Sequence, residues 1–371
     1  MDQAMTRRGL MGAVGWAVAV GAAPPARGAT AQAELSVHFA PPAGVAFLAR
    51  NENPYGPSAK ALAAMAEVAR HGCRYANGAE AELAARIARR FGLTPDHVMV
   101  GQGSTEVLNC AAMALGLTRG IVAAELTFDP PLRWAEAKGV AVRRVPLRSD
   151  MGVDLEALAA TGPAGLVHLV NPNNPTGLLI PGETVRNFVA ALSPKTPVLV
   201  DEAYIELADG GEAHSAIPRI RAGDRVVVTR TFSKLHGLAG LRVGYALGHP
   251  ELIAAMRGWS MSNGGNAAGL AAALASLEDE AFLAFSRERI RTARERLAAA
   301  ARAHGLEVLP SHANFVFARV GDAERLRARL AERGVIVRGP YPGFPQWSRV
   351  SCGRLEDVER YAAELPRALA G

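Results

Sequence analysis

Ser233, Lys234 and Arg242 lie in one glycine-rich stretch, Thr229 to Tyr245, and their side chains suit one kind of chemistry. A lysine amine can condense with an aldehyde to form a Schiff base. A hydroxyl and a guanidinium can hold a phosphate on the same compound. The stretch follows the β-branched run 226–228, which predicts a buried strand with the reactive residues in a loop at its end. The alternative is an ordinary solvent-exposed turn.

The lysine content of the chain points to one residue. The sequence holds only four lysines: Lys60, Lys138, Lys195 and Lys234. A Schiff base needs a primary amine that can lose its proton, and arginine cannot supply one. Among the four, only Lys234 follows a strand of the buried type. Lys234 is therefore the candidate for covalent catalysis.

A second glycine-containing turn is a candidate phosphate site. Gly101 to Glu106 follows the predicted strand 98–100 and opens a predicted helix over 105–115. Such a turn directs free backbone N–H groups and the positive helix end at an anion, and Ser104 and Thr105 add hydroxyl donors. A dinucleotide-binding fingerprint is a rival interpretation, but it requires a third glycine where Glu106 stands. A helix start without any ligand is the other alternative.

Polar residues follow two further predicted strands. The strand 198–200 ends at Asp201, and an aspartate there is costly to bury unless it meets a positive partner, such as a protonated pyridine nitrogen. The strand 166–170 ends in the loop 171–177, which its Asn-Pro steps and its glycine keep out of helices and sheet ladders. Phe128 follows the strand 121–123 and either packs in the core or covers a planar ring.

The order of these elements predicts the fold class. Strands and helices alternate as far as residue 228, which indicates an α/β fold with a doubly wound, mostly parallel sheet. Open sheets of this kind bind ligands at the carboxyl ends of their strands, where the candidate residues occur. Long amphipathic helices follow between 267 and 304. A smaller α+β domain comes last, with strands near 306–309, 314–319, 335–338 and 347–351 and a closing helix over 355–369.

The N-terminus has the pattern of an export signal. Arg7 and Arg8 precede an apolar run from Leu10 to about residue 23, which is shorter than the roughly 20 residues needed to span a bilayer. The layout is typical of a twin-arginine signal peptide, so we expect a periplasmic or exported protein without stable membrane insertion. An uncleaved anchor, a misassigned start or a cytoplasmic protein are the alternatives. The expected parts are a signal over 1–31, an arm over 32–60, a large ligand-binding domain over 61–250, and an interdomain helix with a small domain over 251–371.

Composition excludes some other classes. The chain has 371 residues and a formal net charge of +6, with basic and acidic residues mixed along helical segments. The absence of a basic block with interleaved aromatics argues against nucleic-acid binding. The three cysteines, Cys73, Cys110 and Cys352, form no CxxC or Cys/His cluster, which argues against a disulfide framework and a structural zinc site.

The order and spacing of the motifs resemble those of the fold-type I pyridoxal-phosphate (PLP) aminotransferases. The motifs are 103–106, 171–177, 201–204, Ser233-Lys234 and Arg242. Within that group the chain is most similar to the histidinol-phosphate aminotransferases, through 51–57, the doubled asparagine of 171–177 and 313–315. The resemblance covers nearly everything from about residue 45 onward. It implies a large and a small domain, the cofactor PLP, a small-molecule amino donor, a 2-oxo acid acceptor and a homodimer.

The resemblance also implies roles for individual residues. Lys234 would form the Schiff base and carry the proton, with Asp201 on the pyridine nitrogen and Tyr204 on the ring hydroxyl. Arg349 would bind the substrate carboxylate. The remaining cofactor contacts would be Ser104, Thr105, Phe128, Asn174, Ser233, Arg242 and, from the neighbouring subunit, Tyr75. The further substrate contacts would be Tyr55, Asn314 and Arg338.

Some positions depart from the histidinol-phosphate pattern. Phe128 stands where a tyrosine is usual, 262–266 replaces a more apolar segment, and Tyr75 lacks the usual following proline. With the export signal, these departures favour a paralogue that acts on another amino acid or amine. A PLP-dependent decarboxylase of the phosphothreonine type is the alternative enzyme. A secreted binding protein is the alternative outside enzymes, but it would be expected to have lost Lys234 or Asp201.

Overall fold

The computed structural model describes residues 40–370 except 77 and 263. The elements below belong to one compact unit, Gly44–Gly371. The expected export signal, residues 1–31, lies outside the described residues. Within the described part of the chain, no helix is both long and apolar enough to cross a bilayer.

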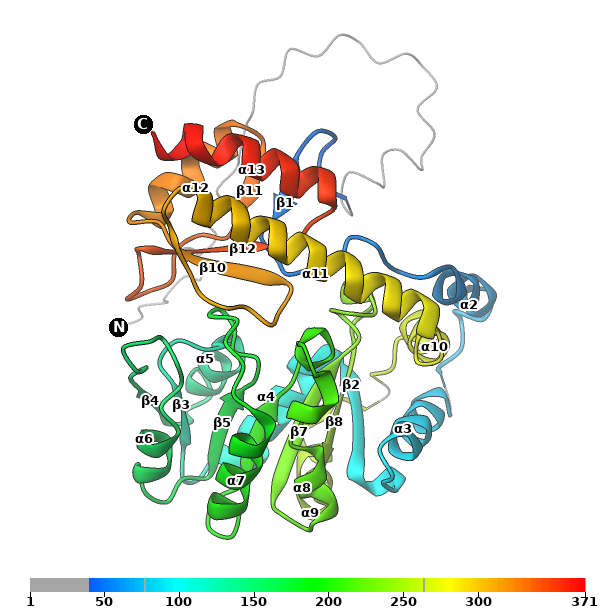
Figure 1. The fold of residues 1–371 in the computed structure, drawn as a ribbon. Helices are drawn as coiled ribbons and strands as arrows, with labels where there is room; N and C mark the ends of the chain where they lie inside the picture. Colours follow the sequence, from blue (N-terminus) through cyan, green and yellow to red (C-terminus); the bar gives the residue numbers. More distant parts are fainter. Residues whose placement is uncertain (1–39, 77, 263, 371) are drawn as a thin grey trace, which may run out of the picture. The chain divides into compact units, whose positions relative to one another are not determined.

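A seven-stranded sheet forms the centre of the unit, in the order β2-β8-β7-β6-β5-β3-β4 (Figure 1). The strands β4, β3, β5, β6 and β7 run parallel, whereas β8 is antiparallel to both of its neighbours. This confirms the predicted fold class. The bounds are β2 Val98–Gln102, β3 Ile121–Ala124, β4 Val142–Val145, β5 Leu166–Val170, β6 Val198–Asp201, β7 Val226–Thr231 and β8 Val243–Gly248.

The strand β8 was not predicted from the sequence, because its glycines indicated a loop. Gly244 is required there by close packing, because a Cβ at this position would collide with the backbone of Gly103 and Ser104. The missing side chain lets the start of the next helix lie directly against the sheet.

Helices cover both faces of the sheet, which explains why its strands read as continuous apolar runs. In β6, Val198 and Val200 face one core cluster, and Leu199 faces the other. The helices α4 (Gly103–Gly116), α5 (Pro130–Glu136) and α9 (Pro250–Arg257) pack on the Leu199 side. The helices on the opposite side are α3 (Ala79–Arg90), α6 (Leu155–Ala160), α7 (Gly182–Leu192), α8 (Ile217–Arg221) and α10 (Ala267–Ser276).

The C-terminal part has its own sheets and core. The strands β9 (Glu307–Val308), β10 (Phe315–Arg319) and β12 (Trp347–Ser351) form an antiparallel sheet in the order β12-β10-β9. The helices α11 (Glu280–Ala303) and α13 (Leu355–Leu369) pack against each other beside it (Figure 1). The C-terminal part also contains α12 (Ala323–Glu332) and β11 (Val335–Val337). Short 3-10 helices occur earlier in the chain: η1 (Pro95–His97), η2 (Ile205–Leu207), η3 (Gly211–His214) and η4 (Ala239–Leu241).

The N-terminal arm contributes to this C-terminal part. Its strand β1 (Ala46–Leu48) pairs in parallel with β11, so the arm is anchored almost 290 residues further along the chain. Ala46 and Leu48 are fully buried in the same core cluster as Val335. After the arm, Ser58 caps α2 (Ala59–Ala69), because its hydroxyl accepts the Ala61 N–H at 3.2 Å.

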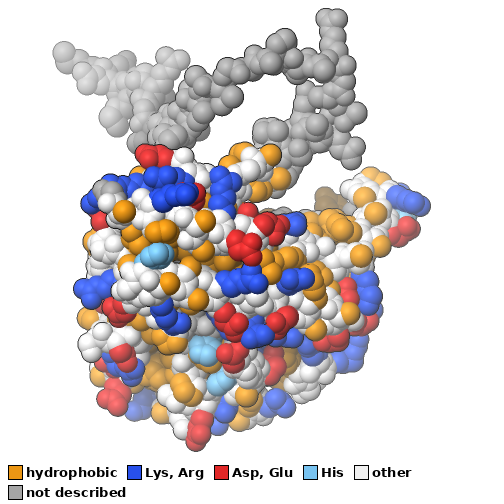
Figure 2. Space-filling view, turned by 45° about the horizontal axis from the view of Figure 1, so that its top comes forward, with side chains coloured by type: hydrophobic (Ala, Val, Ile, Leu, Met, Phe, Trp, Pro, Cys, Tyr) orange, Lys and Arg blue, Asp and Glu red, His pale blue; other side chains and the backbone are white. Residues whose placement is uncertain are grey.

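The face shown in Figure 2 carries basic and acidic side chains side by side, without a patch of one sign. Ion pairs also join opposite charges within and between helices. Arg296 on α11 reaches Glu359 on α13 at 2.5 Å, and Arg291 reaches Glu295 at 2.7 Å. Positive charges on α11 are therefore balanced in part by neighbouring carboxylates.

Candidate active site

The ends of several strands bring the predicted site residues together, and Lys234 lies among them. Its side chain is half-buried, and its Nζ donates a hydrogen bond of 2.9 Å to the backbone oxygen of Asn51. It also lies 5.5 Å from the centre of the Tyr204 ring. Burial lowers the pKa of Lys234 to about 8, and the positive charge of Arg349 adds to the shift. A large share of the amine is thus unprotonated in mildly alkaline solution.

Asp201 ends β6 and is buried, with 2% of its surface exposed. Thr229 stands directly opposite on β7, and its hydroxyl donates to Asp201 Oδ1 at 2.9 Å. The backbone N–H of Ala203 donates to the same oxygen at 3.2 Å. Burial raises the pKa of Asp201 to about 6, although both hydrogen bonds act in the opposite direction. A cationic partner would return this carboxylate to its charged form.

Tyr204 follows Asp201 closely, and its hydroxyl oxygen accepts two hydrogen bonds. Asn51 Nδ2 donates at 3.1 Å and Asn174 Nδ2 at 3.2 Å. Both contacts use the oxygen as acceptor, so the hydroxyl proton remains available for a bound group. Burial raises the pKa of Tyr204 to about 12, which keeps the proton on the oxygen at neutral pH. The ring packs edge-on against Phe315 at 5.3 Å.

Arg349 reaches the same place from β12 and is 6% exposed. Its Nη1 donates to Asn174 Oδ1 at 2.8 Å, and its Nη2 donates to the backbone oxygen of Ala49 at 2.8 Å. Its Nε is buried without a partner, as is Oδ1 of Asn314. Asn314 Nδ2 donates to the backbone oxygen of Asn51 at 2.8 Å. An anion could therefore take hydrogen bonds from a guanidinium that is already fixed in place.

Arg242 lies at the N-terminal end of α4. Gly103 has a left-handed φ of 72°, and a Cβ there would collide with the Arg242 guanidinium. Ser104 and Thr105 are half-buried in the first turn of α4. The positive charge of Arg242 also contributes to the lowered pKa of Lys234. The helix end and the guanidinium together form a cradle for a phosphate.

Ser233 and Phe128 lie on the connections around this cradle. The Ser233 hydroxyl accepts a hydrogen bond of 2.9 Å from Thr231 Oγ1 and is 7% exposed. Phe128 is half-buried and packs against the core on the α4 side. The neighbouring Thr127 donates to Asn173 Oδ1 at 2.9 Å, which ties the connection after β3 to the loop 171–177.

Three further predicted residues contact other parts of the structure, and their roles stay predictions. Tyr55 packs edge-on against Phe285 on α11, with ring centres 5.6 Å apart. Arg338 is exposed and lies over the Tyr341 ring at 5.2 Å, and Arg349 lies 6.0 Å from the same ring. Arg338 and Arg349 therefore contact the same aromatic ring.

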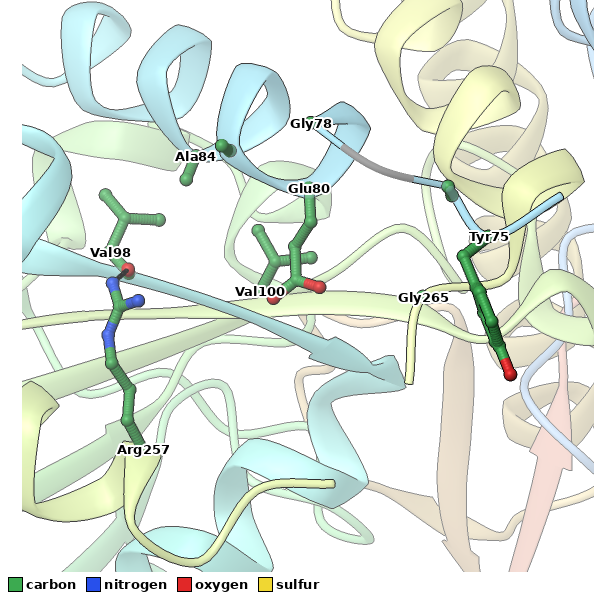
Figure 3. A pocket seen from close by; sticks show the side chains of 10 residues that line it. Tyr75, Gly78, Glu80, Ala84, Val98, Val100, Arg257 and Gly265 are labelled. Atoms are coloured by element: carbon green, nitrogen blue, oxygen red, sulfur yellow. Dashed lines mark hydrogen bonds between the residues drawn. The ribbon is translucent and has the colours of Figure 1, made fainter. Parts of the chain in front are cut away.

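Tyr75 is the third of these residues and is 75% exposed. It lines a pocket of about 310 Å³ between α3 and β2, with Glu80 and Arg257 on the other walls (Figure 3). Neither Lys234 nor Asp201 lines that pocket. The role predicted for Tyr75 belongs to a neighbouring subunit and stays a prediction.

Two contributors to the site were not identified from the sequence. Thr229 could have been found, because parallel pairing of β6 and β7 places it opposite Asp201. The sequence indicates no role for Asn51 beyond its place in the segment 51–57. Its contacts reach Lys234, Tyr204 and Ser351, which no local pattern indicates.

Comparison with known proteins identifies the family. The family "Aminotransferase class I and II" matches residues 44–365. A curated relative, histidinol-phosphate aminotransferase 1 of Cupriavidus pinatubonensis, is 39% identical over 338 residues, which is 88% of this chain and 89% of the relative. Among solved structures, histidinol-phosphate aminotransferase from Sinorhizobium meliloti in complex with pyridoxal-5'-phosphate has a TM-score of 0.81 and 30% identity, and covers 87% of this chain and 90% of that chain. A Thermus thermophilus aspartate aminotransferase variant has a TM-score of 0.77 and 25% identity, and covers 88% and 92%. The chain therefore belongs to the class I and II aminotransferase family.

Proposed function

We propose that the chain moves an amino group from histidinol phosphate, or from a related amino acid or amine, to a 2-oxo acid. One observation carries the proposal. A half-buried lysine amine with a lowered pKa, a buried carboxylate and a fixed guanidinium share one site, in Lys234, Asp201 and Arg349. The histidinol-phosphate aminotransferases among its relatives support the choice of donor.

The residues of the site fit PLP, the cofactor of this family. Asp201 is buried and has a raised pKa, so a nearby cation would stabilise its charged form. The protonated pyridine nitrogen of PLP would be such a cation. The space that Gly103 leaves beside Arg242 suits a phosphate, with Ser104, Thr105 and Ser233 as further donors and Asn174 and Tyr204 at the ring hydroxyl. When bound, the group supplies an electron sink for the bonds at the substrate carbon.

Lys234 would serve as both the anchor of the cofactor and the base of the reaction. Because its pKa is lowered to about 8, its Nζ can accept a proton at mildly alkaline pH and return it. The hydrogen bond to the Asn51 oxygen holds the amine within the site. Replacing Lys234 by alanine removes the only primary amine that this site offers among the described residues.

Arg349 would decide the orientation of the substrate. Its two Nη groups are held by Asn174 and Ala49, which leaves Nε for the substrate anion. A substrate whose anionic group is fixed in this way, the phosphate of histidinol phosphate or the carboxylate of an amino acid, can present its C–H bond to the base. The decarboxylase alternative is not favoured, because the relatives are named as aminotransferases.

We also propose a homodimer, in which Tyr75 reaches the cofactor phosphate of the neighbouring subunit. Its exposure supports this role, as does the exposure of Leu62, Trp259 and Met261. Sedimentation equilibrium would measure the mass, and a monomer at micromolar concentration would contradict the proposal.

The reaction itself does not depend on export through the twin-arginine route. We propose export from the sequence pattern alone, and cell fractionation of the full chain would test it.

The function is tested with the purified chain and PLP. We expect an absorbance band near about 420 nm that borohydride bleaches, and its loss in Lys234→Ala. Histidinol phosphate is then compared with a panel of amino acids and amines, each with a 2-oxo acid acceptor. Transfer from histidinol phosphate above all others supports the proposed donor. Transfer from a different amine alone would support the paralogue interpretation, and release of CO2 would contradict transamination.

A further inference from the structure

Asn51 has a backbone conformation that asparagine adopts at a cost. Its φ is 55°, in the left-handed region. Among residues 40–370, with 77 and 263 left aside, the structure shows two other non-glycine residues with positive φ, Met151 and Arg242. Such residues persist where the surroundings hold them, and they concentrate at functional sites. Asn51 and Arg242 both belong to the site of Lys234.

The strained backbone aims the Asn51 carbonyl at two side chains. Its oxygen accepts from Lys234 Nζ at 2.9 Å and from Asn314 Nδ2 at 2.8 Å. The carbonyl thus uses both of its lone pairs. One of these contacts holds the reactive amine, and the other holds the arm against the small domain.

The side-chain amide of Asn51 is held by Ser351 through its oxygen and contacts Tyr204 through its nitrogen. Ser351 Oγ accepts the Asn51 N–H at 2.8 Å and donates to Oδ1 at 2.6 Å. Because Oδ1 takes the Ser351 proton, the amide can face only one way, with Nδ2 toward the Tyr204 hydroxyl at 3.1 Å. Asn51 is 2% exposed, so water does not compete for these contacts.

We propose that Asn51 is a positioning residue, which holds the Lys234 amine through its carbonyl and the Tyr204 hydroxyl through its amide. The proposal rests on Lys234 as the cofactor-binding lysine. Asn51 makes no contact with the substrate in this scheme and acts through the two groups that it orients. It also joins three parts of the site: the arm, the ends of β6 and β7, and β12.

The side-chain requirements explain why asparagine stands here. Asparagine tolerates a left-handed backbone better than most residues, and its amide carries both a donor and an acceptor. Aspartate has the same shape but replaces the donor with a charged oxygen. Glycine keeps the backbone conformation without strain but removes the amide. Comparing these two substitutions therefore distinguishes the contribution of the side-chain amide from that of the backbone conformation.

The first readout needs no cofactor. Competitive labelling of the full cofactor-free chain, followed by peptide mass spectrometry, measures the reactivity of Lys234 against pH, and the chain's four lysines make the peptides easy to resolve. We expect Asn51→Asp to raise the pKa of Lys234 by at least about one unit, because a buried negative charge is added beside it.

The second readout uses the PLP-loaded enzyme. Asn51→Gly should weaken PLP binding at least about tenfold, because it removes one of the two donors that fix the Tyr204 hydroxyl. The pH at which the absorbance band of the bound cofactor changes should shift as well. The kcat should fall more than KM changes, since the donor and acceptor contacts remain.

Asn53 supplies the matched control. It is an asparagine of the same arm, 5% exposed, whose Nδ2 donates to the Leu235 oxygen at 2.8 Å and to Ser286 Oγ. Asn53→Asp and Asn53→Gly test burial in the arm without touching Tyr204. The proposal is overturned if the Asn51 variants leave Lys234 reactivity and PLP affinity unchanged, or if the Asn53 variants change them equally. Failure of the proposed function is a different result, namely retention of the absorbance band in Lys234→Ala.

Discussion

Thr229 donates a hydrogen bond of 2.9 Å to Asp201 across the pairing of β7 with β6. This bond opposes the effect of burial, which raises the pKa of Asp201 to about 6. The Thr229 hydroxyl therefore favours the charged form of Asp201, the carboxylate that would face the cofactor ring.

Thr229→Val should therefore weaken PLP binding in a pH-dependent way. Valine keeps the shape but removes the donor, and a hydrogen bond to a charged group contributes roughly 1.5–3 kcal/mol. The pKa of Asp201 should rise further, so the loss of affinity should grow from pH 8.5 to pH 6. Fluorescence titration with PLP measures it. Thr196→Val, at another buried threonine, is the control. A wild-type pH profile in Thr229→Val would contradict the assignment.

Lys234→Met should stabilise the cofactor-free protein at neutral pH. The pKa of Lys234 lies at about 8 in the folded chain against an ordinary 10.5, so the unfolded chain binds more protons between these values. Stability of the wild type therefore rises with pH across that window, and the full cost, about 3 kcal/mol, is present below pH 8.

Urea unfolding at pH 7, 9 and 10.5 measures the difference between Lys234→Met and the wild type. The advantage of the variant should be largest at pH 7 and nearly gone at pH 10.5. Lys138→Met changes an exposed lysine and should show no such trend. A difference that stays constant with pH would show that burial does not control the charge of Lys234.

Arg349→Lys should impair substrate binding while the cofactor remains bound. Lysine keeps the charge but loses the planar guanidinium that Asn174 and Ala49 hold in place. We expect kcat/KM to fall about a hundredfold for amino donor and 2-oxo acid alike, with PLP content unchanged. The control is Arg354→Lys, an exposed arginine on the same connection to α13. Equal kinetics of both variants would remove Arg349 from the site.

Arg230→Met should destabilise the fold strongly. Arg230 and Glu202 form a buried ion pair with N–O distances of 2.7 and 3.0 Å. Removing the cation leaves a buried carboxylate without compensation, which costs about 3–5 kcal/mol. Combining Arg230→Met with Glu202→Gln should recover part of this loss. By contrast, Arg296→Met breaks an exposed pair and should cost less than about 1 kcal/mol in the same urea titration.

Elements with a strong local pattern were predicted well from the sequence. The closing helix over 355–369 has the bounds of α13, because a full amphipathic pattern runs from one end to the other. Strands with continuous β-branched runs, such as β5, were likewise placed correctly. In contrast, β8 was missed and β1 was hidden in the arm. The partner of β1 is distant in the sequence, whereas β8 pairs with the neighbouring β7 and was missed because its glycines indicated a loop.

The site follows the same division. Lys234 and Asp201 stand at the ends of recognisable strands, so their side chains could be predicted to meet. The partner that fixes Lys234 could not, because Asn51 reaches Lys234 across 183 residues and Ser351 across 300. The unusual backbone of Asn51 arises from these contacts rather than from its neighbours in the chain.

The antiparallel β8 limits which sequence changes the active site can accept during evolution. The chain leaves β7, passes Lys234 and turns back at once into β8, whose first residue, Val243, follows Arg242. Lys234, the proposed anchor of the cofactor, and Arg242, the proposed phosphate contact, are thus separated by one reversal of the chain. An insertion or deletion between them would displace one of the two side chains from the site. This segment should therefore tolerate no change of length.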